Sequence, residues 1–317
     1  MRALFWGTPE FATPALRALI GEGFDVVGVV TQPDRSVGRS RSTVQSSPVK
    51  QIALDEGIPV LQPERPRGDD FVAELSRLRP DLSVVVAYGH ILPETVIDLP
   101  QRGTVNIHGS LLPALRGAGP IQAAIREGLV ETGVTIMRMV PALDAGPIIL
   151  QARADVLEDE TYGELSLRLS ELGALTLVEA LSLMELGDAH EQPQDDSLAS
   201  YAHKIERSAT WIDWNASAPS VCRLIRSLDP KPGAVTMLRG SEVKFFGAKL
   251  APHGASMAAG QIQSIDDDGL IVACGEGAAR ITVVQPSGKR RLSPNEWARG
   301  RGAAAGDRFE TSPAAVS

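Results

Sequence analysis

Two uninterrupted apolar runs in the first third of the chain constrain its fold most: VVGVV at 26–30 and VVVA at 84–87. A strand with one face in water alternates apolar and polar residues, whereas a strand covered on both faces is apolar throughout. The runs lie within strands that we predict at 2–6, 25–32, 58–62, 81–87 and 104–108, with helices between them at 10–22, 48–56 and 69–79. This alternation predicts an α/β fold, a Rossmann-like open sheet whose strands are mostly parallel.

The chain changes character at a polar stretch rich in acidic residues, GDAHEQPQDDSLAS at 187–200. Before it, segments 132–139 and 147–154 predict a hairpin-like pair of strands, and the Leu-rich segment 161–186 predicts a long helix. After it, a short amphipathic helix precedes short strands separated by Gly turns, the pattern of a small OB-like β-barrel. The organisation that we predict is a Rossmann-like domain at 1–188, a linker at 189–206 and an OB-like domain at 207–317.

Charge is distributed unevenly between these two domains. The chain of 317 residues has a net charge of −8. Residues 207–317 hold 14 basic and 10 acidic residues, a balance of +4, whereas residues 1–206 hold 17 basic and 29 acidic residues, a balance of −12. The contrast indicates different partners for the two domains, with chance drift of surface charge as the alternative.

Cysteine usage and hydropathy point to the cytoplasm. Cys222 and Cys274 cannot build a disulfide framework, so we expect buried free thiols. The N-terminal segment MRALFWGTPEF lacks the apolar core of a signal peptide, and no apolar stretch reaches the roughly 18 residues that span a bilayer. We expect a cytoplasmic protein with no membrane partner.

The segment NIHGSLLPALRG at 106–117 puts two hydrogen-bonding side chains at the end of a buried strand. Ligands of open α/β sheets bind at the carboxyl ends of the strands. Asn106 and His108 are two residues apart, so they face the same side. An amide donor suits a developing oxyanion, and an imidazole transfers protons near neutral pH. Asp144, in the tight loop ALDAG, is placed to reach back and orient His108; a histidine that only bonds a loop carbonyl is the alternative.

The first loop, WGTPEFA at 6–12, argues against a nucleotide cofactor. It lacks the GxGxxG pattern of dinucleotide-binding folds, and GxxxxGK[ST] occurs nowhere in the chain. Thr8 followed by Pro9 instead predicts the N-cap and the first residue of a helix. The five histidines are scattered without ligand spacing, so we predict no metal site.

The polar segment PDRSVGRSRSTVQSSP at 33–48 predicts a long loop. It holds too few apolar residues to order itself by burial. Arg39 and Arg41 are suited to pair with the phosphates of a partner, and we expect the loop to order when that partner binds. A solvated loop without a role is the alternative.

The segment NIHGSLLPALRGAGPIQAAI, followed by ETGVTIMRMVPALDAGPII, closely resembles the formyltransferases that use 10-formyltetrahydrofolate. Within that group, GTPEFA, TQPDR with SPVK, and VVAYGHILP are similar to the methionyl-tRNA formyltransferases, as are IDWNASA and LDPKPGA in the second domain. The resemblance covers nearly the whole chain.

The resemblance implies an enzyme that transfers a formyl group from 10-formyltetrahydrofolate to the α-amino group of initiator methionyl-tRNA, as a monomer and without a metal. Asn106, His108 and Asp144 would be the catalytic residues. The folate would contact residues of three loops: Ser110, Leu111, Leu112, Pro113, Tyr88, Ile91, Leu92 and Val140. The tRNA would contact basic residues of both domains: Arg39, Arg41, Lys244, Lys289, Arg290 and Arg291.

The residues leave three other functions open. A formyltransferase acting on a sugar nucleotide or on glycinamide ribonucleotide would share the catalytic residues and lack the basic-leaning barrel. A tRNA-binding protein that has lost its activity would keep the fold, although the intact Asn, His and Asp argue against it. A nicotinamide-dependent dehydrogenase is disfavoured by the missing glycine pattern.

Overall fold

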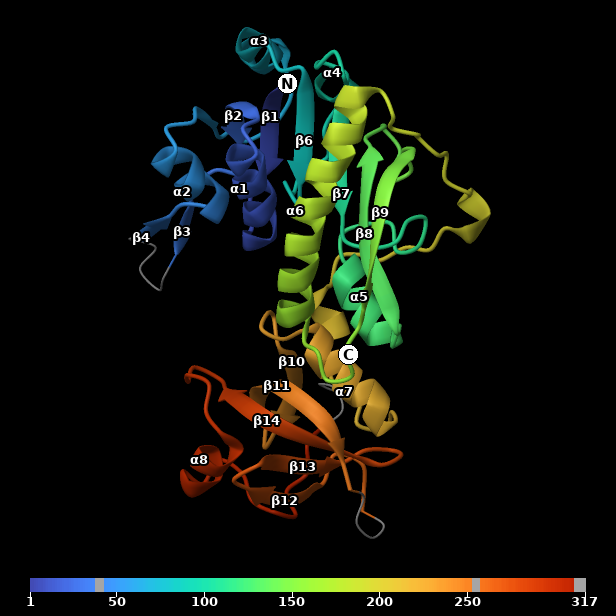
Figure 1. Cartoon of the computed structure of the whole chain (residues 1–317). Helices are drawn as coiled ribbons and strands as arrows, with labels where there is room; N and C mark the ends of the chain where they lie inside the picture. The colour runs from blue at the N-terminus through green and yellow to red at the C-terminus, as the bar shows by residue number, and fades with distance from the viewer. Residues whose placement is uncertain (38–42, 253–256, 311–317) are drawn as a thin grey trace. The chain divides into compact units, whose positions relative to one another are not determined.

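The computed structural model describes residues 1–37, 43–252 and 257–310, which fold into two compact units (Figure 1). The N-terminal unit consists of residues 1–120, 132–155 and 166–202. The C-terminal unit consists of the residues from His203 onward together with the earlier segments 121–131 and 156–165. Two short segments that precede the boundary in sequence therefore pack with the residues that follow it.

A seven-stranded sheet forms the centre of the N-terminal unit, in the order β5-β2-β1-β6-β7-β8-β9. The first five strands are parallel neighbours, and β7 pairs antiparallel with β8. This confirms the mostly parallel open sheet and the adjacent pair β8 and β9. The strands are β1 Arg2–Gly7, β2 Asp25–Val30, β5 Val60–Leu61, β6 Leu82–Val86, β7 Thr104–His108, β8 Glu131–Arg138 and β9 Ile148–Asp155.

Helices cover both faces of this sheet, as the apolar runs predict. Phe5 and Val84 point to a core shared with α1, α2 and α6, whereas Leu4 and Val85 point to a core shared with α3 and α4. None of the helices in the described parts of the chain has the length and apolarity needed to cross a membrane. The helices up to residue 186 are η1 Glu10–Ala12, α1 Thr13–Gly21, α2 Pro48–Asp55, α3 Asp69–Leu78, α4 Glu94–Ile97, α5 Pro120–Glu127 and α6 Tyr162–Leu186.

The chain reverses its direction of travel across the sheet between β1 and β6. Strands β1, β2 and β5 follow one another outward, and the chain then crosses back to β6 on the other side of β1. Ligands of open α/β sheets bind outside the carboxyl ends of the strands at such a reversal. The loops after β1, β2 and β6 therefore border the expected crevice, and the loop after β7 lies beside it.

The polar segment 33–48 contains regular structure that we did not predict. Strands β3 (Arg35–Val37) and β4 (Thr43–Gln45) pair antiparallel. The expectation of a loop without regular structure was wrong for these residues, because both strands carry β-branched residues that favour an extended backbone. Arg39 and Arg41, the predicted phosphate contacts of this segment, lie outside the described residues.

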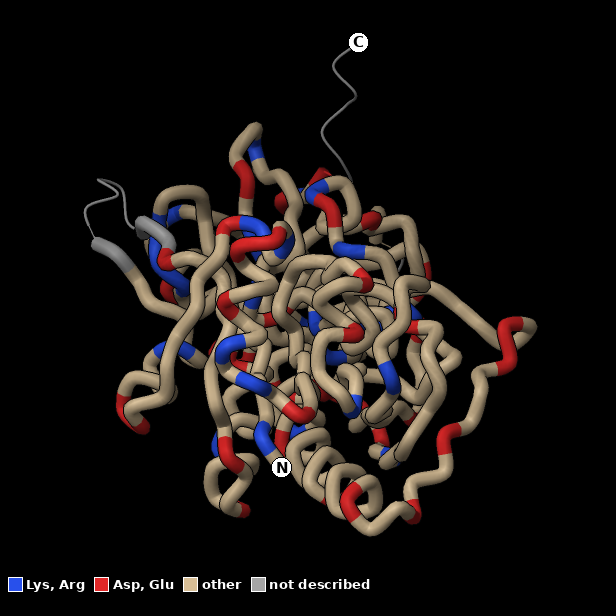
Figure 2. The backbone as a smooth tube through the Cα atoms, turned by 90° about the horizontal axis from the view of Figure 1, so that it is seen from above, with Lys and Arg blue, Asp and Glu red and all other residues tan. Residues whose placement is uncertain are grey.

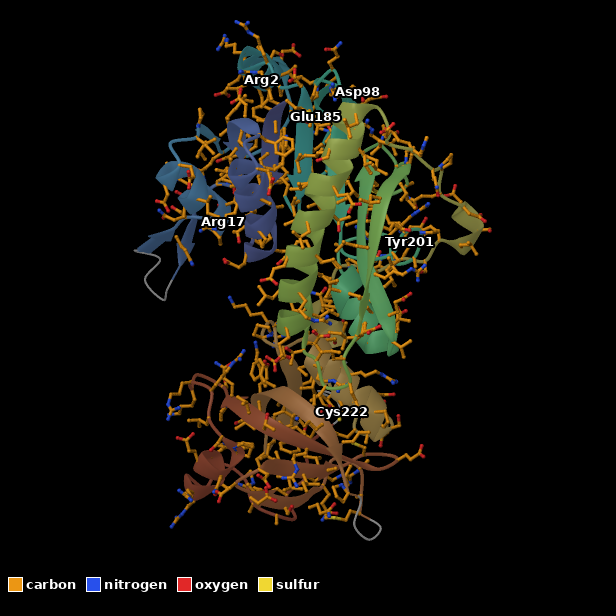
Figure 3. The ribbon with its side chains drawn as sticks, in the orientation of Figure 1. Arg2, Arg17, Asp98, Glu185, Tyr201 and Cys222 are labelled. Carbon is orange, nitrogen blue, oxygen red and sulfur yellow. The ribbon has the colours of Figure 1, made fainter. Side chains whose placement is uncertain are left out.

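The polar stretch after α6 packs along the N-terminal unit as far as Ala202. Gln192 and Ile148, at the start of β9, exchange two backbone hydrogen bonds of 2.8 Å. Tyr201, which is labelled in Figure 3, forms an isolated β-bridge with Arg116 in the loop after β7. Acidic residues stand at several positions along this segment, which projects to the right in Figure 2. Its polar composition is that of an exposed segment attached to the unit by hydrogen bonds, rather than that of a free linker.

The C-terminal unit contains a five-stranded antiparallel sheet in the order β10-β11-β14-β13-β12. Residues 308–310 join its two edges, because Glu310 bridges Met237 in β10 and Arg308 bridges Gln261 just before β12. This confirms the predicted small β domain of short strands, and the structure shows that its strands are antiparallel. Its elements are η3 Arg207–Thr210, α7 Ala218–Ser227, β10 Ala234–Leu238, β11 Ser241–Ala251, β12 Ile262–Asp266, β13 Gly269–Ala273, β14 Ala278–Pro286 and α8 Pro294–Arg299.

The core of this unit contains both cysteines. Trp214 is fully buried and packs against Phe245 and Phe309. Cys222 and Cys274 are free and buried in the same cluster, which confirms the expectation of buried thiols.

Candidate active site

His108 is held at the carboxyl end of β7 by contacts at both ring nitrogens. Its side chain is 6% exposed. Nε2 lies 2.9 Å from the carbonyl oxygen of Leu115, and Nδ1 lies 3.6 Å from Oδ2 of Asp144. Because a carbonyl oxygen only accepts, Nε2 carries a hydrogen and donates it. Nδ1 is therefore the nitrogen that is left for proton exchange.

Two loops present these partners, and both require unusual backbone conformations. Leu115 and Asp144 have φ angles of 59° and 48°, where an L side chain is strained. Oδ2 of Asp144 also accepts the backbone N–H of Gly117 at 2.8 Å, which ties one loop to the other. At Gly117, with φ of 117°, a Cβ atom would lie 2.6 Å from the carbonyl oxygen of Ala202, so the close approach requires glycine.

Asn106 lies two residues before His108 on β7 and faces the same side of the sheet. It is aligned with Val85 of β6 and Met137 of β8, so it stands between two neighbouring strands. Asn106 is partly exposed, whereas Ile107 and His108 are buried. A partly exposed amide beside a held imidazole offers N–H donors to an oxygen atom of a substrate.

The loop after β7 is held by its own hydrogen bonds. Ser110 Oγ donates to a carbonyl oxygen four residues later at 2.6 Å, and its own carbonyl accepts from the Thr135 hydroxyl at 2.7 Å. Leu112 is buried and is joined by a cis peptide bond to Pro113. Leu111 and Pro113 are partly exposed. Of the predicted folate contacts in this loop, these two have side chains that a ligand can reach.

The loop after β6 divides its residues between core and surface. Tyr88 is 2% exposed, and its ring packs edge-on against Trp6 with centroids 5.2 Å apart. Burial raises the pKa of the Tyr88 hydroxyl to about 12. Leu92 is buried as well, whereas Ile91 is 87% exposed and Val140, after β8, is partly exposed. Ile91 and Val140 can present side chains to a ligand, whereas the ring of Tyr88 is enclosed.

A cavity of about 390 Å³ opens where the chain reverses across the sheet, lined by residues after β1, β2 and β6. The Thr8 hydroxyl donates to the Tyr88 carbonyl at 3.0 Å, and Gln32 Nε2 donates to the same oxygen at 3.2 Å. The prediction of Thr8 as a helix cap was wrong, because α1 begins only at Thr13 and the hydroxyl bonds across the sheet edge instead. We did not predict Gln32, since a glutamine after an apolar strand has no characteristic spacing.

The basic residues proposed to contact tRNA in the C-terminal unit differ in how free they are. The Arg291 guanidinium lies 3.6 Å from the centre of the Phe246 ring and so packs on its own unit. Lys244 donates to a backbone carbonyl at 2.9 Å, and Arg290 pairs with a glutamate at 3.2 Å. Lys289 is exposed in the turn after β14. Because the ion pair of Arg290 is exposed to water, Lys289 and Arg290 are the best placed of these four to meet a phosphate.

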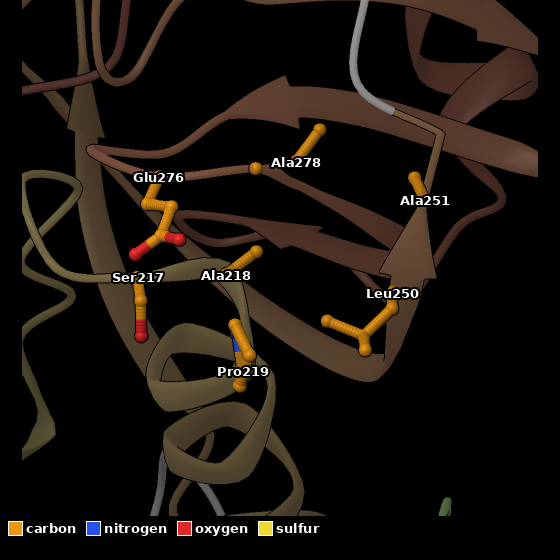
Figure 4. Close-up of a pocket in the computed structure, with 8 residues that line it drawn as sticks. Ser217, Ala218, Pro219, Leu250, Ala251, Glu276 and Ala278 are labelled. Atoms are coloured by element: carbon orange, nitrogen blue, oxygen red, sulfur yellow. The ribbon is translucent and has the colours of Figure 1, made fainter.

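Elsewhere the described residues offer little for a cofactor. A cavity of about 340 Å³ at the start of α7 is lined by small residues that include Ser217, by the exposed side chain of Leu250 and by the carboxylate of Glu276 (Figure 4). A carboxylate there disfavours an anionic ligand. Over residues 1–37, 43–252 and 257–310, no group of three or more His, Cys, Asp or Glu is arranged to hold a metal ion.

Comparison of the sequence with those of known proteins assigns the chain to a family. Residues 1–181 match the family model described as formyl transferase, and residues 204–302 match that of the formyl transferase C-terminal domain. The chain is 43% identical over 300 residues to the methionyl-tRNA formyltransferase of Marinobacter nauticus, with 95% of this chain and 96% of that protein covered. It is 47% identical over 293 residues to that of Pseudomonas fluorescens, with 92% of each covered. This chain belongs to the methionyl-tRNA formyltransferases.

The fold of the family extends to more distant formyltransferases. The crystal structure of WlaRD, a sugar 3N-formyltransferase in the presence of dTDP and 5-N-formyl-THF, superposes with a TM-score of 0.66 at 17% identity. The match covers 92% of this chain and 99% of that one. At this identity the likeness shows the fold alone, so membership in the methionyl-tRNA formyltransferases rests on the sequence relatives.

Proposed function

We propose that this chain transfers the formyl group of 10-formyltetrahydrofolate to the α-amino group of initiator methionyl-tRNA, giving N-formylmethionyl-tRNA for translation initiation. The observation that carries the proposal is the pair of His108 and Asp144, 3.6 Å apart, in a chain whose full-length relatives are methionyl-tRNA formyltransferases. The proposal places the enzyme in the cytoplasm as a monomer that needs no metal ion.

The folate co-substrate supplies a formyl group on a nitrogen that leaves as an amine once it is protonated. The carboxyl edge of the sheet suits such a ligand in two respects. The loop after β6 turns through Ala87 and Gly89, both at positive φ, and so brings backbone groups to the cavity. Ile91, Leu111 and Val140, in the loops after β6, β7 and β8, have apolar side chains that are exposed or partly exposed. We assign the folate to these loops, together with Ser110, Leu112, Pro113, Tyr88 and Leu92.

We assign Asn106 to the formyl oxygen. When the methionyl amine attacks the formyl carbon, negative charge develops on that oxygen, and an amide N–H aimed at it lowers the barrier. Such a donor is typically worth about 3 kcal/mol. The side chain is carried by a central strand, so it needs little reorganisation as charge develops.

We assign proton transfer to Nδ1 of His108. The attacking amine becomes positively charged and must lose a proton, which Nδ1 takes while Nε2 keeps its hydrogen bond to Leu115. The carboxylate of Asp144, 3.6 Å from Nδ1, stabilises the imidazolium that results. Nδ1 then returns the proton to the nitrogen that leaves. No covalent bond to the enzyme is formed.

We assign tRNA phosphates to basic residues of both units. Lys289 and Arg290 are exposed on the C-terminal unit, and Lys244 and Arg291 lie in the same unit. Arg39 and Arg41 of the 33–48 segment are proposed to contact the acceptor end. The net charge of +4 over residues 207–317 supports phosphate binding by the C-terminal unit.

One competition assay tests the function. The enzyme is given 10-formyltetrahydrofolate with a labelled formyl group, together with methionyl-tRNA, glycinamide ribonucleotide or a dTDP-linked amino sugar. We expect the label on methionyl-tRNA alone. Transfer to the amino sugar or the ribonucleotide at a comparable rate would assign the chain to a different acceptor.

A further inference from the structure

The side-chain amide of Gln194 joins the two loops that hold His108. Its Nε2 donates to the backbone carbonyls of Asp144 and Gly146, at 2.9 and 2.7 Å. Its Oε1 accepts two N–H groups of Arg116, at 3.0 and 2.8 Å. An amide has two N–H donors and one oxygen with two lone pairs, so every hydrogen-bonding position of Gln194 is used.

Arg116, which donates to the Gln194 oxygen, is itself held by several further hydrogen bonds. It is 3% exposed and lies in the loop that follows β7. Besides Gln194 it pairs with Asp196 at 2.8 Å. Its backbone N–H donates to Ser200, and its carbonyl accepts from Ala202, both at 2.8 Å. Residues 194–202 are therefore attached to the loop after β7 by backbone and side-chain hydrogen bonds together.

Ser200 makes a second connection, to Leu115, whose carbonyl oxygen is the hydrogen-bond partner of Nε2 of His108. Its Oγ accepts the N–H of Leu115 at 2.9 Å, and the carbonyl of Leu115 accepts from Nε2 of His108. Both contacts of the imidazole are thus tied to one segment, Asp144 through Gln194 and Leu115 through Ser200. Leu115 and Asp144 are also the two non-glycine residues of these loops at positive φ, a state that persists only when the surroundings impose it.

We propose that residues 192–202 position the catalytic pair of His108 and Asp144, with Gln194 and Ser200 as the positioning residues. They act through Asp144 and Leu115 and contact no reacting atom. Displacement of a catalytic group by about 1 Å costs on the order of 100-fold in rate. Release of either loop should therefore lower turnover even where the protein remains folded. The activity measurements that test this rest on the proposed function.

Gln194→Glu is the sharpest test. The carboxylate has nearly the same shape and still pairs with Arg116, but it cannot donate to the carbonyls of Asp144 and Gly146. We expect kcat to fall by about 10- to 100-fold while KM for both substrates stays close to wild type; the melting temperature falls to the extent that the two carbonyls lose their donor. Asp196→Asn is the control, because it weakens the other side-chain contact of Arg116 without touching the Asp144 loop. Wild-type kcat in Gln194→Glu, or an equal loss in Asp196→Asn, would overturn the proposal.

A double variant separates positioning from a general structural role. In an Asp144→Ala background, Gln194→Glu should cause no further loss of single-turnover rate, since its effect passes through Asp144. A further loss of the same size would contradict the proposal. Ser200→Ala should lower kcat while Ser200→Thr, which keeps the hydroxyl, restores it; these two decide the matter if Gln194→Glu does not fold. Absence of product with the wild-type protein would instead refute the proposed function.

Discussion

At the scale of single residues, the chemistry of the site depends on which atoms are already engaged. Nε2 of His108 donates to Leu115, and Oδ2 of Asp144 accepts from Gly117 while lying 3.6 Å from Nδ1. The geometry leaves one nitrogen of the imidazole for proton exchange and one carboxylate beside it. The two residues can therefore be tested separately.

Asn106→Ala, His108→Ala and Asp144→Asn should each lower turnover by about 100-fold or more. The asparagine at 144 still accepts the N–H of Gly117, so the loop keeps its anchor and only the negative charge beside Nδ1 is lost. Single-turnover formylation measures the rate, and a melting curve checks the fold. Near-normal turnover in His108→Ala would remove it from the mechanism.

Arg291 should matter for the stability of its own unit. Its guanidinium stacks on Phe246, so Arg291→Ala should lower the free energy of unfolding by about 1 kcal/mol, whereas Lys289→Ala should leave it unchanged. Urea denaturation of the two variants gives the comparison. Equal stability of both would show that the stacking contributes nothing measurable.

At the scale of elements, short helices depend on their ends. Helix α8 has only the residues Pro294–Arg299, yet it buries Trp297 against the barrel core. Ser293 Oγ accepts the N–H of Glu296, whose side chain accepts the N–H of Ser293 in return. Because half of such a short helix lacks internal hydrogen-bond partners, this reciprocal cap helps to hold Trp297 in place.

Ser293→Ala should therefore destabilise the protein by about 1 kcal/mol. Ser287→Ala, at an exposed serine in the turn after β14, is the control and should have no effect. Both are compared by urea denaturation followed through tryptophan fluorescence, since Trp297 packs against Phe309 in this core. A cap variant as stable as the control would show that tertiary packing alone defines α8.

At the scale of the whole molecule, the division into units changes how the tRNA proposal is tested. Residues 121–131 and 156–165 belong to the C-terminal unit, so a chain ending near residue 206 would leave them without their partners. Gly163, for example, donates its backbone N–H to Asp229 at 2.9 Å. Surface substitutions in the intact chain give a cleaner answer than truncation.

Lys289→Gln combined with Arg290→Gln should weaken tRNA binding and flatten its salt dependence. Each phosphate contact contributes nearly one to the slope of log affinity against log salt, so the slope should fall by about 2. Binding titrations over a range of salt concentrations measure it, with folate binding as the unaffected control. An unchanged slope would place the tRNA contacts elsewhere.

The buried thiols should report opening of the C-terminal unit. Burial raises the pKa of Cys222 to about 11 and that of Cys274 to about 12. A raised pKa keeps a thiol neutral up to a higher pH, and only the thiolate is nucleophilic, so at pH 8 the native protein should react negligibly with a thiol reagent. Both cysteines should react on denaturation. Rapid labelling of the native protein would indicate frequent local opening.

Much of the architecture could be read from local patterns. Apolar runs and helical spacing predicted the sheet, its covering helices and the second β domain, because each element must bury a face of fixed period. The two-residue spacing of Asn106 and His108 predicted that they share a side of the sheet, since alternation along a strand is a local property.

The connections between distant segments required the tertiary structure. Gln194 lies 50 residues from Asp144, and Ser200 lies 85 from Leu115, so no short-range pattern marks either bond. The polar stretch after α6 has the composition of a linker, and composition is the same whether water or a neighbouring loop satisfies its hydrogen bonds. The assignment of 121–131 and 156–165 to the C-terminal unit was decided in the same way, by packing partners far away in the chain.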